Sequence, residues 1–305
     1  MKICSTGWVT TMKIYNIGSL NIDYVYTVDH FVSAGETLSS LGMRVFPGGK
    51  GLNQSIATAK AGASVIHGAV VGDGGELLLN AMSSAGVDIS RIKNIGGECG
   101  HTIIQVDKTG QNCILLFPGT NQRMDRQYAE QVLFDAQPGD ILILQNEINA
   151  LDVIFTVAHS KGMQIVFNPS PLQLDMKNLP LEYVSWWFCN EIEGEALFGS
   201  SDPQEIAENF LKQYPHSHLI LTLGGNGSLF KDAEQCLMQP VYKVTPVDTT
   251  AAGDTFTGYF MATIAAGKDV KTALEIAAKA AAIAVSRAGA ASSIPCIEEV
   301  LTTAF

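Results

Sequence analysis

The segment Val247–Phe256 (Val-Asp-Thr-Thr-Ala-Ala-Gly-Asp-Thr-Phe) brings a carboxylate to the start of a predicted helix. The β-branched run 242–247 predicts a strand, and a helical pattern begins at Gly253 after a row of small residues. A strand that ends there leaves the backbone N–H groups of residues 251–254 unpaired, and the helix dipole makes them an anion site. Asp254 is then either a helix-start residue that complements the dipole or a base aimed at whatever the anion reacts with.

Two polar pairs follow other predicted strands. Asn21 and Asp23 flank one apolar residue after the strand 13–18, so their side chains point to the same side of an extended segment. They suit the hydroxyls of a small ligand, or an Asx-type turn. Asn190 and Glu193 lie on one face of a predicted helix start. They suit a water-mediated hold on Mg²⁺ or a phosphate, and equally an N-cap with a capping-box glutamate.

Two glycine-rich turns lie beside these pairs. The segment 47–54 leads into a helix that runs to about Ala61, and it places Lys50 and Asn53 where they can face the pocket of Asn21 and Asp23. The segment 223–227 follows the strand 218–222 and suits a flat ring or a phosphate lying against backbone, or a plain hairpin turn. Neither turn is a Walker A loop, and the chain has no G-x-G-x-x-G fingerprint, which excludes a standard dinucleotide site.

The composition limits the class of protein. The chain has 305 residues, of which 47% are hydrophobic and 16% charged, and a formal net charge of -11 that argues against nucleic acid or an anionic membrane as a partner. Six scattered cysteines without a C-x-x-C pair indicate a reduced, cytoplasmic chain without a zinc site. His216 and His218 have no carboxylate or cysteine beside them, which argues against a metal site there. No stretch is apolar enough to span a membrane.

Helices and strands alternate along most of the chain. Residues 1–11 precede a second methionine and are expected to be an N-terminal extension, so we place a single domain at 12–305. Within it the pattern predicts an α/β fold, a doubly wound and mostly parallel sheet with helices on both faces. The predicted elements are strand 13–18, strand 64–72, helix 74–85, helix 125–136, strand 140–145, helix 150–162, strand 163–168, strand 183–189, strand 218–222, strand 228–230, helix 253–267 and helix 270–286.

Other strands lie outside this alternation. The runs 24–31 and 37–46 have no helix between them, and 102–106 with 112–117 predict a hairpin. Together they predict a small antiparallel sheet, a lid from about 24–46 and 100–117. Such a sheet needs a cover for its bare face, either the active-site cleft or another subunit.

The polar groups all follow predicted strands. These groups are 21–23, Glu147, 190–193, 222–227 and 251–254. Ligands of a doubly wound sheet bind at the carboxyl ends of its strands, so one shared site explains the groups better than separate structural features do. One side offers hydroxyl-binding groups and the other a glycine-lined nucleotide slot, with the anion site and Asp254 between them. This layout is typical of phosphoryl transfer.

Two segments carry a resemblance to a known family, Pro47–Gln54 (Pro-Gly-Gly-Lys-Gly-Leu-Asn-Gln) and Asp248–Phe256, with Ala-Ile-Ala-Val-Ser-Arg at 282–287 and the Asn190–Glu193 motif in support. From about residue 12 to 299 the chain resembles the PfkB-type carbohydrate kinases, and among them the ribokinases. The resemblance implies a ribokinase-like fold and an ATP- and Mg²⁺-dependent enzyme. That enzyme would transfer the γ-phosphate to a sugar hydroxyl, D-ribose giving D-ribose 5-phosphate.

The resemblance also implies roles for individual residues. Asp254 would be the catalytic base, and the anion hole would come from the amides of Ala251, Ala252 and Gly253. The sugar-contacting positions would be Asn21, Asp23, Gly49, Lys50, Asn53, Glu147 and Asp254. The ATP positions would be Asn190, Glu193, Thr222, Leu223, Gly224, Gly225, Asn226, Gly227 and Gly253, with Glu193 tied to Mg²⁺ and phosphate. A monovalent cation, usually K⁺, would lie at Asp248, Thr250, Ala284, Arg287, Gly289 and Ser293.

Partners and alternatives follow from the same resemblance. The lid of ribokinases pairs two subunits, which predicts a homodimer. Another kinase of the family remains an alternative, namely a fructokinase, a 2-keto-3-deoxygluconate kinase or a nucleoside kinase such as adenosine kinase. A catalytically silent sugar-binding regulator belongs to a different class, and the intact Asp254 argues against it.

Overall fold

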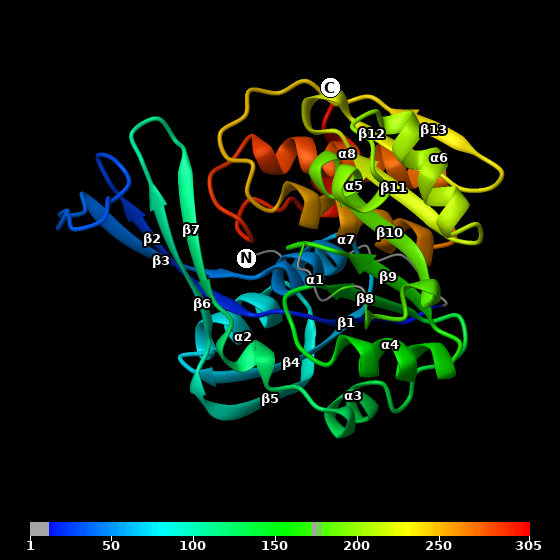
Figure 1. Ribbon diagram of the computed structural model, residues 1–305, viewed down its shortest axis with the longest axis horizontal. Helices are drawn as coiled ribbons and strands as arrows, with labels where there is room; N and C mark the ends of the chain where they lie inside the picture. Colours follow the sequence, from blue (N-terminus) through cyan, green and yellow to red (C-terminus); the bar gives the residue numbers. More distant parts are fainter. Residues whose placement is uncertain (1–11, 173–175, 177) are drawn as a thin grey trace.

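The computed structural model describes residues 12–172, 176 and 178–305, so the predicted extension 1–11 lies outside it. Within these residues, nine strands form the main sheet in the order β13-β12-β11-β10-β9-β8-β1-β4-β5 (Figure 1). β11, β12 and β13 pair antiparallel, and the other neighbours pair parallel, which confirms the predicted sheet. The strands are β1 (Ile14–Ile17), β4 (Val65–Asp73), β5 (Asp88–Glu98), β8 (Ile141–Gln145), β9 (Gln164–Asn168), β10 (Val184–Asn190), β11 (His218–Thr222), β12 (Ser228–Lys231) and β13 (Cys236–Gln239).

Helices cover the sheet on both faces because the chain winds it in two directions. In the sheet, β4 lies on one side of β1, whereas β8, β9, β10 and β11 follow one another on the other side. Right-handed crossovers therefore place the helices of the two halves on opposite faces. The described helices are α1 (Lys50–Lys60), α2 (Glu76–Ser84), α3 (Arg126–Val132), α4 (Leu151–Ser160), α5 (Glu191–Phe198), α6 (Pro203–Gln213), α7 (Ala252–Ala265), α8 (Val270–Val285) and α9 (Ile297–Thr302). The sequence did not predict β5, β13 or α6.

The close packing of α1 on α7 matters for the site. A Cβ at Gly258 of α7 would lie 2.5 Å from the Cβ of Ala57 and 2.8 Å from the carbonyl oxygen of Gln54, both on α1. Only glycine allows the two helices to approach this closely. The polar residues of α1 are therefore held against the first turns of α7.

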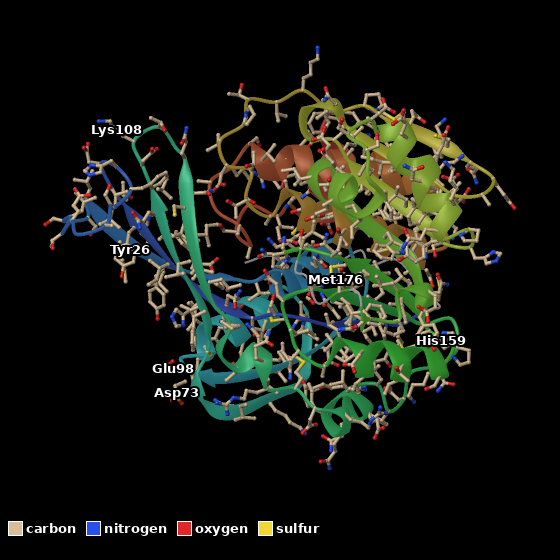
Figure 2. The ribbon with its side chains drawn as sticks, in the orientation of Figure 1. Tyr26, Asp73, Glu98, Lys108, His159 and Met176 are labelled. Atoms are coloured by element: carbon tan, nitrogen blue, oxygen red, sulfur yellow. The ribbon has the colours of Figure 1, made fainter. Side chains whose placement is uncertain are left out.

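The lid is a separate four-stranded sheet in the order β3-β2-β6-β7, composed of β2 (Asn21–Thr27), β3 (Gly42–Gly48), β6 (Gly100–Val106) and β7 (Asn112–Phe117). It extends away from the main sheet, and Tyr26 and Lys108 lie on it (Figure 2). The predicted hairpin is confirmed, but the prediction of a purely antiparallel lid was wrong, because β2 and β6 pair parallel. Both strands continue from parallel strands of the main sheet, β1 and β5, and leave it in the same direction.

The predicted strand 242–247 is also wrong. Residues 240–248 form no ladder, and the amides of Val247 and Asp248 instead donate to the carbonyl of Val285, at 2.7 and 3.2 Å. The run is apolar because it lies over α8 and lines a cavity that it forms with that helix. Among the described residues, no helix is both long and apolar enough to cross a membrane.

Candidate active site

The carboxylate of Asp254 is buried at the start of α7, where the side chain is only 7% exposed. Its Oδ2 accepts a hydrogen bond from Asn53 Nδ2 at 3.0 Å, and its Oδ1 accepts one from Gln54 Nε2 at 2.9 Å. Both donors come from α1, which Gly258 holds against α7. Two neutral amides thus fix the carboxylate, which distinguishes it from a solvent-exposed residue that only complements a helix dipole.

Backbone amides surround this carboxylate. Ala251 precedes the helix with φ of 61°, a left-handed conformation that turns the chain into α7. The amides of Gly253 and Asp254 lie in the first turn, where an amide has no acceptor within its own helix. One predicted donor is already used, because the amide of Ala252 donates to the carbonyl of Thr249 at 3.3 Å. The anion site therefore has fewer free donors than the sequence predicted.

A cavity of about 280 Å³ lies in front of these amides. It brings together many of the predicted residues, which come from α1, the end of β10, β11 and the start of α7. Those lining it are Lys50, Asn190, Glu193, Thr222, Ala251, Ala252, Gly253 and Asp254. α1, β10, α5, β11 and α7 therefore supply one polar pocket, but the predicted residues Asn21, Asp23, Gly49, Asn53 and Glu147 do not line it.

A cation among carboxylates sets the electrostatics of this pocket. Burial lowers the pKa of Lys50, but the carboxylates of Asp254, Glu147 and Glu193 outweigh it and hold that pKa above its usual value. Burial raises the pKa of Glu147, although the neighbouring Lys50 opposes the shift. Lys50 therefore stays charged, and a positive charge next to a cavity of this kind favours an anionic ligand.

Asn190 and Glu193 satisfy both interpretations of their spacing. The Asn190 side chain accepts from the amide of Glu193 at 2.9 Å, and Glu193 accepts from the amide of Asn190 at 3.0 Å, so a complete capping box begins α5. Glu193 also accepts a hydrogen bond from Ser170. Both residues nevertheless line the cavity, so the cap orients side chains that face the site.

The predicted hydroxyl-binding residues lie where the lid joins the main sheet. Asp23 accepts from Thr102 Oγ1 at 2.6 Å, across the parallel β2–β6 pair. Burial raises the pKa of Asp23 to about 6, against the effect of the Thr102 hydrogen bond. A Cβ at position 48 would lie 1.9 Å from Oδ2 of Asp23, so only Gly48 leaves room for this carboxylate. Asn21 is tied to the same junction, because its Oδ1 accepts from Asn121 Nδ2 at 2.8 Å.

Glu147 and Gly49 complete this side. Glu147 accepts from the hydroxyl of Ser19 and from the amide of Lys50, which fixes it against the start of α1. Gly49 has φ of 97°, and a Cβ there would lie 2.8 Å from the carbonyl oxygen of Ser19. A side chain at Gly49 would therefore be both strained and obstructed. Asn53 keeps its Oδ1 buried without a partner among the described residues.

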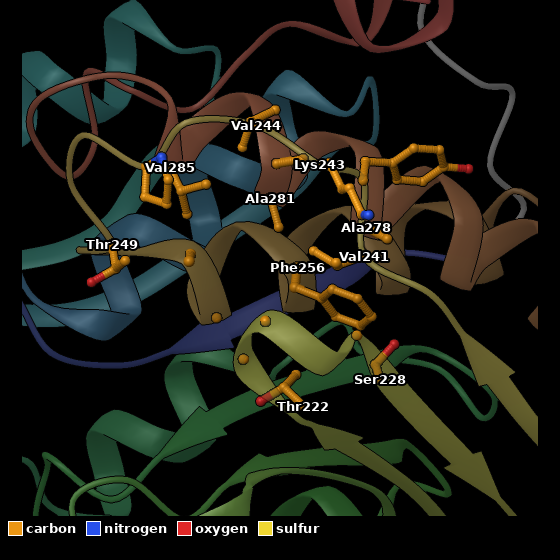
Figure 3. Close-up of a pocket in the computed structure, with 18 residues that line it drawn as sticks. Thr222, Ser228, Val241, Lys243, Val244, Thr249, Phe256, Ala278, Ala281 and Val285 are labelled. Carbon is orange, nitrogen blue, oxygen red and sulfur yellow. The ribbon is translucent and has the colours of Figure 1, made fainter. Parts of the chain in front are cut away.

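A second, larger cavity of about 610 Å³ adjoins the first (Figure 3). Glycines of the turn after β11 line one side and small residues of α8 the other, and Figure 3 shows Ala278 and Ala281 across from Thr222 and Ser228. Residues 241–246 contribute a further wall. Thr222, Thr249, Ala252 and Gly253 line both cavities, which therefore meet at the start of α7.

Not every predicted nucleotide position faces this space. Gly224, Gly225 and Gly227 line the larger cavity, but Leu223 and Asn226 line neither of the two. Leu223 is buried in the core, and the amide of Asn226 closes the turn onto the carbonyl of Leu223 at 2.8 Å. In this conformation Leu223 packs in the core and Asn226 closes the turn, and neither lies at the wall of a cavity where ATP was predicted to bind.

The predicted cation residues lie in two loops that Asp248 joins. Its Oδ1 accepts from the amide of Thr250 and its Oδ2 from the amide of Gly289, both at 2.9 Å. Burial raises the pKa of Asp248, but the hydrogen bonds that its carboxylate accepts lower that pKa by a larger amount. The pKa of Asp248 is therefore below its usual value.

Three other predicted cation residues already have partners. The carbonyl of Ala284 accepts from the amide of Arg287, whose guanidinium pairs with Glu299. Ser293 is buried and donates to the carbonyl of Ala290 at 2.8 Å. Nowhere in the described ranges do three His, Cys, Asp or Glu side chains form a group that could hold a metal ion.

Sequence reasoning missed four polar residues at the site. Gln54, Gln145 and Asn16 form a buried series of amides behind Asp254, and the Ser228 hydroxyl is buried at the wall of the larger cavity. Gln54 follows Asn53 directly in a segment that was singled out, so its position was a usable signal. The other three carry no local pattern, because only the packing of distant strands brings them to the site.

Known proteins resemble this chain over nearly its whole length. Residues 12–297 match the model of the pfkB family carbohydrate kinases. A ribokinase from Schizosaccharomyces pombe is 34% identical over 95% of this chain and 96% of that protein. The crystal structure of ribokinase from Cryptococcus neoformans in complex with ADP has a TM-score of 0.84 and 30% identity, covering 95% of this chain and 99% of that one.

A third relative has been solved with two small molecules bound. The structure of Arabidopsis thaliana ribokinase complexed with ribose and ATP has a TM-score of 0.86 and 25% identity, covering 95% of this chain and 97% of that one. These similarities span the lid, the main sheet and both cavities rather than a single motif. The chain belongs to the pfkB family of carbohydrate kinases.

Proposed function

We propose that this enzyme transfers the γ-phosphate of ATP to D-ribose and produces D-ribose 5-phosphate. The observation that carries the proposal is the place of Asp254, a buried carboxylate between a polar junction under the lid and a glycine-lined cavity. Relatives named ribokinase at 34% and 30% identity, and one solved with ribose and ATP, support ribose as the sugar.

The proposed mechanism assigns one task to each side of the site. Asn21, Asp23 and Glu147 bind sugar hydroxyls, since a carboxylate or amide oxygen accepts from a hydroxyl. Asp254 takes the proton from the attacking hydroxyl, and that oxygen forms a bond to the γ-phosphorus while the bond to the leaving ADP breaks. First-turn amides of α7 and the Lys50 ammonium stabilise the negative charge on the transferred group.

Two cations belong to the proposal. Mg²⁺ would neutralise the phosphate charge, and Glu193 and Asn190, which line the smaller cavity, would hold it through its water shell, because Mg²⁺ retains several waters and needs few protein ligands. K⁺ is proposed to bind near Asp248, whose carboxylate joins the loops of Thr250 and Gly289 by accepting from their amides. Oxygen ligands of this kind suit a hard cation.

The lid supports a proposed homodimer. Residues in register on neighbouring strands share a face, so Val45, Tyr24, Ile103 and Leu115 form one row across the lid, on the face opposite Asp23. Val45, Ile103 and Leu115 are exposed. Such an apolar face is typical of a protein interface. A single species of dimer mass in light scattering at micromolar concentration would support the dimer, and a monomer would contradict it.

A cytoplasmic location is also part of the proposal. The described cysteines, namely Cys99, Cys113, Cys189, Cys236 and Cys296, are all free thiols. Free thiols are typical of a reducing compartment, and ATP is a cytoplasmic substrate.

An assay of ATP consumption against a panel of acceptors tests the function. We expect turnover with D-ribose to exceed turnover with fructose, 2-keto-3-deoxygluconate and adenosine, and K⁺ to increase it. A preference for another acceptor would replace ribose with that substrate. Turnover that does not respond to K⁺ would remove the cation site from the proposal.

The variant Asp254→Asn tests the base. It keeps the shape of the side chain but cannot accept the proton, so we expect turnover to fall by about 10³-fold or more, while ATP binding measured by calorimetry persists. Near-normal turnover in this variant would show that another group acts as the base.

A further inference from the structure

Three buried amide side chains connect Asp254 to the centre of the main sheet. Gln54 Nε2 donates to Asp254 Oδ1 at 2.9 Å, and Gln145 Nε2 donates to Gln54 Oε1 at 2.7 Å. Gln145 Nε2 also donates to Asn16 Oδ1 at 3.1 Å, and Asn16 Nδ2 donates to the carbonyl of Gly51 at 3.1 Å. Gln54, Gln145 and Asn16 are each 0% exposed.

The chemistry of the two ends fixes the orientation of every amide in this series. A carboxylate only accepts, so Gln54 turns its NH₂ group to Asp254 and its oxygen to Gln145. A carbonyl also only accepts, so Asn16 turns its NH₂ group to Gly51 and its oxygen to Gln145. From either end, Gln145 must present its NH₂ group. The two constraints agree, and no amide in the series can flip without losing bonds on both sides.

The series lies at the point where the strand order reverses. Asn16 is in β1 and Gln145 ends β8, the neighbouring parallel strands from which the chain winds in opposite directions. A Cβ at Gly18 would lie 2.1 Å from Gln145 Oε1 and 3.0 Å from Asn16 Oδ1, so glycine leaves the space that the amides fill. None of the three amides lines either cavity. Their hydrogen bonds go to Asp254, to one another and to the carbonyl of Gly51.

We infer that Gln54, oriented by Gln145 and Asn16, is a positioning residue that holds the Asp254 carboxylate in one orientation. The inference rests on the proposed function only in taking Asp254 as the base. A carboxylate that accepts a buried hydrogen bond stays ionised to lower pH. Asn16 and Gln145, on two central strands of the main sheet, hold the Gln54 side chain, and Gln54 in turn holds Asp254.

Other charged groups act on Asp254 from the elements packed around it. Lys50 on α1 and Glu147 after β8 both interact electrostatically with Asp254. Both remain in a variant that replaces only Gln54. The neighbour Ser55 offers a matched control, because it is also 0% exposed on α1 but its Oγ pairs with His67 Nδ1 at 2.8 Å and not with the site.

The test compares Gln54→Met, which keeps the length of the side chain but has no donor, with Ser55→Ala. For Gln54→Met we expect the acid limb of the kcat profile to move up by about one pH unit and kcat at pH 7 to fall about 10-fold. The KM for sugar should change little. For Ser55→Ala, which also loses a buried hydrogen bond, the acid limb should stay in place even if the protein is less stable.

A titration without substrate makes the outcome independent of the sugar. The carboxyl ¹³C signal of Asp254, assigned by its absence in Asp254→Asn, should titrate at higher pH in Gln54→Met than in the wild type or Ser55→Ala. Equal midpoints in folded protein would overturn the inference. If Gln54→Met does not fold, Gln145→Met carries the same test, since it removes the donor that orients Gln54. A wild type that does not phosphorylate ribose would contradict the proposed function and leave this titration unaffected.

Discussion

The two sides of the site are built from different chemistry. Where the lid joins the main sheet, carboxylates and amides gather, and neighbours fix them, as Thr102 fixes Asp23 and Ser19 fixes Glu147. At the nucleotide side, glycines and the alanines of α8 line a cavity of about 610 Å³. We therefore expect the first side to select a ligand through hydrogen bonds and charge, and the second through shape and backbone contacts.

The largest effect should follow from filling the nucleotide side. Ala281 is half-buried and lines the larger cavity, so the ring of Ala281→Phe would occupy the space for the base. We expect the KM for ATP to rise about 100-fold or more, equivalent to about 2.8 kcal/mol, while ribose binding without nucleotide is unchanged in calorimetry. An equal loss of ribose affinity would show that the two sides are not separable.

A smaller effect should follow from titrating the sugar side. The pKa of Asp23 is raised to about 6, so lowering the pH from 7.5 to 5 protonates it and removes a hydroxyl acceptor. We expect the KM of the wild type for ribose to rise about 10-fold over this range. The KM of Asp23→Asn should be higher than that of the wild type at pH 7.5 and should not change with pH. A KM of the wild type that does not change with pH would contradict the role of this carboxylate.

The Asp23 carboxyl should also make the stability of the protein depend on pH. Folding raises the pKa of Asp23 above its ordinary value of 3.8, so the charged form is the less favourable one in the folded protein. The free energy of unfolding should therefore decrease as the pH rises from about 4 to about 6. Asp23→Asn should raise Tm at pH 7.5 and leave it unchanged at pH 4, and a rise at both values would point to packing instead.

Much of the sugar side was predictable because its residues are polar and lie next to strand ends. The buried run Ile141–Leu144 predicted an interior parallel strand, and Asn21, Asp23 and Glu147 were singled out because they follow such strands. Gln145 was not assigned a role, although it ends the same strand. Its function depends on Asn16 and Gln54, and no local pattern shows that these residues meet.

The nucleotide side was harder to predict because alanine and valine residues that line a cavity give the same sequence pattern as those that fill a core. The run 242–247 was predicted as a strand, since β-branched residues are enriched both in strands and along apolar walls. Its amides pair with Val285 instead of a neighbouring strand. Gly224 and Gly227 have positive φ, and a Cβ at Gly227 would lie 2.1 Å from the carbonyl oxygen of Gln239, so this turn leaves a compositional signal.

The smallest effect concerns one hydroxyl on the otherwise apolar nucleotide side. Ser228 is 2% exposed and lines the larger cavity, and its Oγ has no hydrogen-bond partner among the described residues. Ser217 is a matched control, because it is also buried but its Oγ donates to the carbonyl of Val184 at 2.7 Å. We expect Ser217→Ala to lower the free energy of unfolding by about 1 kcal/mol and Ser228→Ala to leave it equal or higher.

Addition of ATP should affect the Tm of the two serine variants differently. If the nucleotide supplies the missing partner of Ser228, the wild type gains more from ATP than Ser228→Ala does, because binding to the folded state adds to its stability. The ATP-dependent rise in Tm should be smaller in Ser228→Ala and unchanged in Ser217→Ala. An equal rise in all three proteins would mean that the nucleotide side recognises its ligand by shape and backbone alone, which would make the contrast with the sugar side complete.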